Sequence, residues 1–240
     1  MGTEFKGPIT EREPNTTSDA RHWYSHQPAG NDPDYVSYFN DFKDPGNDFD
    51  VTNDWTVTTT EAGAGSATEA ITAGARAGEL AITNDDADND LDSIQHKNES
   101  WSLTSGKKLW FETRIKIEDA DTEDAFIGLA ITDTTPLDAS DAVGFRVETT
   151  DASLQCECTK NSTTTQKDSE QDLSDDTYVK LGIYYNGSST VYFYVDRTLV
   201  ATIETNLPDD ENLCITFHHQ NGDAAADAMT IDYVKVVMER

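Results

Sequence analysis

The densest run of residues able to bind a ligand lies between positions 84 and 92, with the sequence NDDADNDLD. Calcium takes about six to eight oxygen ligands, and carboxylates at alternate positions of one loop can supply several of them. Leu91 replaces the glycine of an EF-hand loop, and the closing glutamate is missing. We therefore expect no bound cofactor and a solvated acidic loop, with a weak calcium site as the alternative. Its candidate ligands are Asp86, Asp88, Asp90 and Asp92.

Three tyrosines late in the chain suggest a second kind of binding chemistry. Tyr184, Tyr192 and Tyr194 alternate with the apolar residues of their segments, so they share the opposite face of a strand. Sugar rings stack on aromatic side chains, which makes these tyrosines candidates for carbohydrate binding. The alternative is that they form part of the second half of an ordinary sandwich core.

A cluster of aromatic and imidazole groups lies near the N-terminus. Residues 1–37 contain four prolines and no persistent helix or strand period, which predicts an extended N-terminal arm. His22, Trp23, Tyr24 and His26 could anchor this arm to a neighbouring protein, because Trp and Tyr are favoured at interfaces. The same side chains could instead pack back on the domain.

The elements that must position these residues are strands. Leu109, Phe111, Ile115 and Ile117 alternate with polar residues, as in a half-buried strand. Segments 143–147, 179–185, 191–195, 213–217 and 231–237 repeat this pattern, and 126–131 is apolar on both faces. Turn residues at Asn186-Gly187 and Asp196-Arg197 separate neighbouring strands. The pattern predicts an all-β fold over residues 38–240, with two antiparallel sheets packed face to face.

The charge balance excludes several classes of partner. The chain has 46 acidic and 17 basic residues and a net charge of −29. Such a chain repels nucleic acid and anionic membrane surfaces, so neither is expected as a partner. No apolar run approaches the length of about 18 residues that a membrane span needs. Three cysteines are too few for a disulfide framework.

The order of segments resembles a known fold family. The resemblance rests on FNDF at 39–42, Trp55, GELAITN at 78–84, GFRV at 144–147, YFYVDR at 192–197 and MTIDYV at 229–234. These segments are similar to the concanavalin A-like jelly roll of lectins, glucanases and laminin-G-like modules. The resemblance covers roughly residues 38 to 240 and implies a two-sheet antiparallel jelly-roll sandwich.

The resemblance also bears on catalysis. Glucanases of this fold carry their carboxylates on one strand, in the pattern Glu-x-Asp-x-x-Glu. This chain lacks that motif: segment 112–118 offers Glu112 beside Arg114 and Lys116, which suits ion pairs. No phosphate-binding loop and no Ser-His-Asp arrangement is visible either. The sequence therefore predicts a protein that is not an enzyme.

With its irregular arm and acidic, Thr-rich domain, the whole chain most resembles capsid decoration proteins of tailed bacteriophages. That likeness implies a non-catalytic virion protein that assembles in the host cytoplasm and binds the major capsid protein on the outside of the head. It also implies a homo-oligomer, a trimer if it follows the three-fold positions of the capsid. The alternative function is a lectin-like module that binds host glycans.

Overall fold

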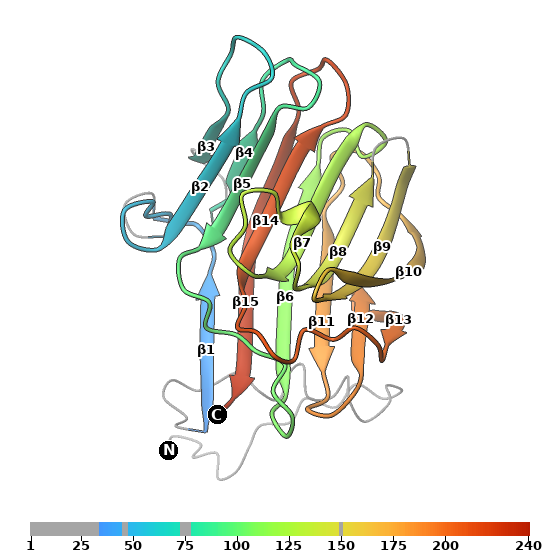
Figure 1. Cartoon of the computed structure of the whole chain (residues 1–240). Helices are drawn as coiled ribbons and strands as arrows, with labels where there is room; N and C mark the ends of the chain where they lie inside the picture. Colours follow the sequence, from blue (N-terminus) through green and yellow to red (C-terminus); the bar gives the residue numbers. More distant parts are fainter. Residues whose placement is uncertain (1–33, 45–47, 73–77, 149–150) are drawn as a thin grey trace, which may run out of the picture.

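A computed structural model of the chain describes residues 34–44, 48–72, 78–148 and 151–240. Within these residues the chain forms fifteen strands and one short 3-10 helix (Figure 1). Apolar side chains at alternate positions of the strands turn toward one common core, as the period of a half-buried strand requires. The predicted all-β architecture is confirmed. No helix in these residues is long and apolar enough to cross a membrane.

The strands form two antiparallel sheets that pack face to face. The first sheet has the order β13-β12-β11-β6-β15-β4-β3, and β1 also pairs with β15. The second sheet has the order β10-β9-β8-β7-β14-β5-β2. We call them sheet A and sheet B.

Sheet A contains β1 (Tyr35–Asn40), β3 (Thr68–Ile71), β4 (Leu80–Thr83), β6 (Leu109–Ile117), β11 (Val179–Tyr185), β12 (Val191–Val195), β13 (Thr198–Ile203) and β15 (Ala228–Glu239). Sheet B contains β2 (Trp55–Thr60), β5 (Leu91–His96), β7 (Glu123–Ala130), β8 (Ala142–Glu148), β9 (Asp151–Lys160), β10 (Thr163–Asp172) and β14 (Cys214–Asn221). The 3-10 helix η1 (Pro136–Asp138) lies in the loop between β7 and β8.

The predictions for β6 and for the turn after β12 agree with this arrangement, and the prediction for the hairpin at Asn186 differs in the length of its loop. Strand β6 buries Leu109, Phe111, Ile115 and Ile117 in the core. The turn between β12 and β13 is formed by Asp196 and Arg197, which both have positive φ angles, as a tight turn of two residues requires. The hairpin at Asn186 has a longer loop than its Asn-Gly sequence predicts. There the Asn186 Oδ1 atom accepts hydrogen bonds from the backbone amides of Ser188 and Ser189.

The sandwich begins slightly before the boundary expected from the sequence. Tyr35 pairs with Glu239 and Asn40 with Val234, so residues 35–37 belong to β1 rather than to an arm. Residues 1–33 lie outside the described residues, and the arm itself stays a prediction.

Glycines allow close packing on the outward face of sheet B. Gly128 and Gly144 are directly opposed on β7 and β8, and the ring of Phe126 lies against Gly144. A Cβ atom at Gly144 would lie 2.5 Å from Phe126 Cζ, and one at Gly128 would lie 2.3 Å from the Val143 carbonyl oxygen. A side chain at Gly128 would therefore have to move backbone atoms.

We expect Gly128→Ala to lower the free energy of unfolding by about 1–3 kcal/mol, because overpacking against a backbone is not relieved by a rotamer change. Urea unfolding should show a lower midpoint with an unchanged slope. Thr163→Ala, at an exposed position of β10 in the same sheet, is the control and should change stability by less than about 0.5 kcal/mol. Equal midpoints for Gly128→Ala and the wild type would contradict the expectation.

Candidate functional site

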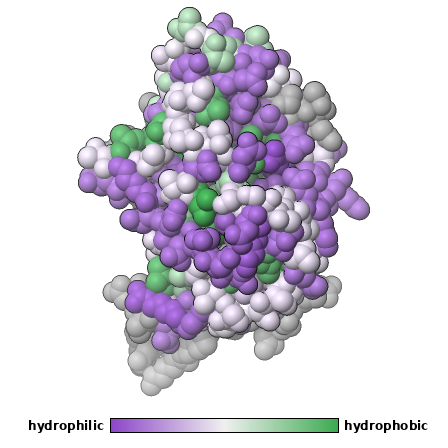
Figure 2. All heavy atoms as spheres, viewed as in Figure 1, coloured by the Kyte–Doolittle hydropathy of each residue, from purple (hydrophilic) through white to green (hydrophobic). Residues whose placement is uncertain are grey.

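The outward face of sheet B gathers polar side chains on neighbouring strands. Cys156 and Cys158 of β9 point into the core, so Glu157 between them faces outward. It lies opposite Gly144 of β8 on one side and Gln166 of β10 on the other. Hydrophilic residues predominate on the side of the molecule seen in Figure 2, where sheet B lies in front. The arrangement places a carboxylate in the middle of a polar strip.

Arg146 of β8 links the groups of this strip. Its Nε atom lies 2.9 Å from Glu148 Oε1, and its Nη1 atom lies 3.9 Å from Glu157 Oε2. The Nη1 atom also donates a hydrogen bond of 2.8 Å to the carbonyl oxygen of Leu137, in the loop of η1. The η1 loop thus helps to hold the guanidinium group of Arg146 in its position between Glu148 and Glu157.

The two carboxylates have different surroundings. The Glu157 side chain is only 3% exposed, whereas that of Glu148 is 54% exposed. Burial raises the pKa of the Glu157 carboxyl above its ordinary value, although the hydrogen bond from Gln166 and the charge of Arg146 lower it in part. Glu157 therefore holds its proton to a higher pH than an exposed glutamate does.

Glu148 and Glu157 share the guanidinium group of Arg146, so the two carboxylates flank one cation. Enzymes that hydrolyse glycosidic bonds use two carboxyl groups whose surroundings differ. Glu157 is buried and its pKa is raised, whereas the side chain of Glu148 is exposed. The strip thus combines hydrogen-bonding groups for a sugar with a carboxylate pair.

A second polar group on the same face is buried. Ser93 Oγ and His218 Nδ1 are 2.6 Å apart, and both residues are about 1% exposed. Burial, together with the neighbouring His219, lowers the pKa of His218 to about 4. His218 is therefore neutral near pH 7, and it lies beneath the surface rather than in contact with a ligand.

The three predicted sugar-binding tyrosines lie together on the outward face of sheet A. Tyr184 stacks between Trp110 and Tyr192, with ring centroids 5.3 Å and 5.7 Å apart. Tyr194 joins the same cluster. Tyr184 and Tyr194 are 2% and 8% exposed, and Tyr192 is half-buried. The structure thus brings the predicted residues together as a mostly buried row, and their role in sugar binding stays a prediction.

The predicted calcium ligands separate in the structure. Asp86 and Asp88 are exposed in the β4–β5 loop, and Asp92 lies on β5, where it accepts a hydrogen bond from Thr59. Asp90 instead joins an acidic triad with Glu61 and Asp85, whose carboxylate oxygens lie within 4.8 Å of one another. This triad is compatible with calcium. The sequence did not indicate Glu61, because it lies in a different loop.

The predicted anchor residues His22, Trp23, Tyr24 and His26 lie outside the described residues. Binding to the major capsid protein, assembly into a homo-oligomer and location on a virion therefore stay predictions from the sequence.

Comparisons with known proteins identify the architecture. No family model and no curated protein matches the chain. Among solved structures, an endo-1,3-β-glucanase from Streptomyces sioyaensis is 12% identical, with a TM-score of 0.60 over 86% of this chain and 97% of that one. A Bacteroides ovatus family 16 glycoside hydrolase, solved with a glucan product, is 14% identical, with a TM-score of 0.60 over 83% and 99%. A protein of unknown function from Shewanella oneidensis MR-1 is 19% identical, with a TM-score of 0.58 over 85% and 86%.

The fold is therefore a concanavalin A-like jelly-roll sandwich, and the resemblance seen in the sequence is confirmed at the level of fold. A carbohydrate-binding function is consistent with it. The prediction that the chain is not an enzyme is contradicted, because glycoside hydrolases are among its structural neighbours. That prediction assumed that the carboxylates must lie on one strand. Glu148 and Glu157 lie on the neighbouring strands β8 and β9, so a search for a motif in one segment does not bring them together.

Proposed function

We propose that this chain is a carbohydrate-active domain that binds a polysaccharide across β8, β9 and β10 on the outward face of sheet B. The observation that carries the proposal is Arg146, held between Glu148 and Glu157 on that face. Guanidinium and carboxylate groups form strong hydrogen bonds with sugar hydroxyls. The structural neighbours include glucan-hydrolysing enzymes, which makes glucans the first ligands to test.

In this proposal the residues have distinct roles. Arg146 and Glu148 contact the sugar, since their side chains are 21% and 54% exposed. Glu157 positions Arg146 and Gln166 from beneath. Glu148 and Glu157 also supply the two carboxyl groups that glycoside hydrolysis uses, and the substitutions below test this role.

The binding test is a glycan array followed by calorimetric titration with the best oligosaccharide. We expect Arg146→Met to weaken binding by about 10- to 100-fold, the effect of losing a hydrogen bond to a charged group. Arg197→Met, at an exposed position in the turn between β12 and β13, is the matched control and should change affinity by less than about twofold. An array without binding, or equal losses in both variants, would refute the proposal.

Three further variants distinguish binding on sheet A from binding on sheet B, and binding from catalysis. If Tyr192→Ala removes binding and Arg146→Met does not, the sugar binds sheet A instead. Glucan turnover by the wild type that falls at least about 100-fold in both Glu157→Gln and Glu148→Gln would assign the carboxylate pair to catalysis. Turnover that survives both substitutions would place catalysis elsewhere.

A further inference from the structure

At one end of the sandwich, two loops that cross between the sheets lie against each other. The β2–β3 loop runs from sheet B to sheet A, and the β4–β5 loop runs back from sheet A to sheet B. Asp90 fastens the first loop to the second, since its Oδ1 atom accepts hydrogen bonds from the amides of Ala62 and Gly63. The two loops therefore form one unit that joins the sheets.

This unit concentrates negative charge. The carboxylate oxygens of Glu61, Asp85 and Asp90 lie within 4.8 Å of one another. In the part of the chain that the structure describes, no lysine or arginine forms an ion pair with any of the three. Three like charges so close together repel one another unless a cation lies among them.

Buried acceptor atoms without partners give independent support. Asp90 is 1% exposed, yet its Oδ2 atom has no hydrogen-bond partner, and the buried Oδ2 atom of Asp85 has none either. A buried oxygen that lacks a donor costs free energy, and a coordinated cation removes that cost. Both residues belong to the triad, so the unsatisfied acceptors lie on the side chains that form the charge cluster.

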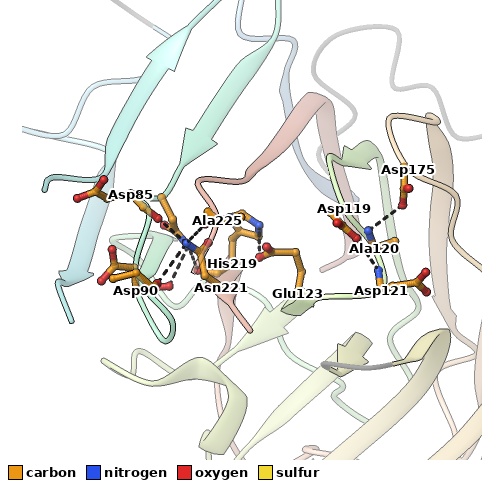
Figure 3. A network of polar contacts seen from close by, with 12 residues as sticks. Asp85, Asp90, Asp119, Ala120, Asp121, Glu123, Asp175, His219, Asn221 and Ala225 are labelled. Carbon is orange, nitrogen blue, oxygen red and sulfur yellow. Dashed lines mark hydrogen bonds and ion pairs between the residues drawn. The ribbon is translucent and has the colours of Figure 1, made fainter. Parts of the chain in front are cut away.

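Hydrogen bonds from Asn221 hold the backbone of Asp85 and Asp90 in place. The side-chain amide of Asn221, at the end of β14, donates to the carbonyl oxygens of Asp85 and Ala225. The backbone amide of Asn221 donates to the carbonyl oxygen of Asp90. Figure 3 shows Asp85 and Asp90 beside Asn221, with the His219–Glu123 pair beyond it. On the other side a Cβ atom at Gly65 would overlap the Asp85 carboxylate, so a side chain at Gly65 would displace it.

The geometry points to a calcium site formed by Glu61, Asp85 and Asp90. All three ligands are carboxylates, hard oxygen donors that favour calcium over zinc or copper. Calcium accepts irregular coordination by six to eight oxygens, whereas magnesium demands a near-ideal octahedron. Ligands that come from two different loops therefore suit calcium better than magnesium. Calcium here ties the β2–β3 loop to the β4–β5 loop and thereby one sheet to the other.

The test uses the full chain after treatment with a chelator. Calorimetric titration should show one calcium ion bound with a Kd at or below about 1 mM, and saturation should raise Tm by about 5 °C or more. Magnesium should give a much smaller shift. Calcium should also slow hydrogen exchange at the backbone amides of both loops, which a distant site would not do. No heat and no Tm shift at 10 mM calcium, a concentration about tenfold above that Kd limit, would overturn the inference.

Substitutions locate the ion. Asp90→Asn and Asp85→Asn should each weaken calcium binding at least about tenfold, because each removes a charged ligand. Asp86→Asn and Asp88→Asn, in the same loop but outside the triad, should change Kd by less than about twofold. If the buried Asp90 variant does not fold, Glu61→Gln replaces it, since Glu61 is exposed. Equal losses in the triad and control variants would place calcium elsewhere.

Discussion

Replacing Trp55 with alanine should lower the free energy of unfolding by about 3–5 kcal/mol, the cost of removing a large side chain from a packed core. Trp55 is fully buried at the start of β2. Its ring lies 5.5 Å from that of His96 and 6.2–6.4 Å from those of Phe42, Phe49 and Tyr38. The indole thus joins three segments: β1 with the residues that follow it, β2 and β5.

Urea unfolding measures this effect. The midpoint should fall in Trp55→Ala while the slope stays constant, because the substitution changes packing and not the extent of unfolding. Trp55→Phe, which keeps an aromatic ring in the same place, should lose clearly less. A loss below about 1 kcal/mol in the alanine variant would show that the site collapses around the cavity and that the ring cluster contributes little.

Trp55 also illustrates what the sequence can predict. The local order of FNDF, a tryptophan and alternating strands was sufficient to indicate the jelly roll, and the structure confirms it. Strand β6 was predictable because its apolar and polar residues alternate over nine positions. These features depend on residues that are close together in the sequence, because alternation with a period of two residues determines which face of a strand is buried.

The candidate sites depend on contacts between distant segments. Glu61 and Asp90 are 29 positions apart, and only the crossing of two loops brings them together. Glu148 and Glu157 share Arg146 as a partner because Glu148 lies two residues beyond it on β8, while the pairing of β8 with β9 places Glu157 opposite Gly144, two residues before it. Alternation between Cys156 and Cys158 does predict that Glu157 points out of the core, but not that Arg146 meets it. The sequence therefore indicates which face of a strand a side chain points to, but it does not indicate which side chain of a neighbouring strand it contacts.

The tyrosines show the same limit. Their shared face was predictable from alternation, and Tyr184 and Tyr192 are indeed cross-strand neighbours. Their burial was not predictable, because it depends in part on Trp110 of β6, a strand far away in the sequence.

A buried pair next to the acidic end of the sandwich should make stability depend on pH. Glu123 Oε2 and His219 Nε2 are 2.6 Å apart, and neither side chain is exposed to solvent (Figure 3). Burial raises the pKa of Glu123 from 4.5 to about 8; a hydrogen bond with Asp227 opposes this shift, and the charges of Asp119, Asp223 and Asp124 add to it. Burial lowers the pKa of His219 from 6.5 to about 4. Both groups therefore prefer their neutral forms in the folded protein.

The two groups act in opposite directions on stability. Glu123 binds its proton more tightly in the folded chain, so its contribution is complete below pH 4.5 and is lost as the pH rises through about 8. His219 binds its proton less tightly in the folded chain. Its contribution is complete above pH 6.5 and is lost as the pH falls through about 4. Stability should therefore be greatest between about pH 5 and 7.

Between pH 6 and pH 9, the wild type should lose on the order of 3 kcal/mol of unfolding free energy through Glu123. Glu123→Gln keeps the shape of the side chain without a titrating proton, so this alkaline loss should largely disappear. Glu148→Gln, at an exposed carboxylate, should leave the profile unchanged. Unfolding measured in chelator from pH 4 to pH 9 tests this. Parallel profiles of Glu123→Gln and the wild type would mean that Glu123 is already ionised in the folded chain, and that His219 is its charged partner.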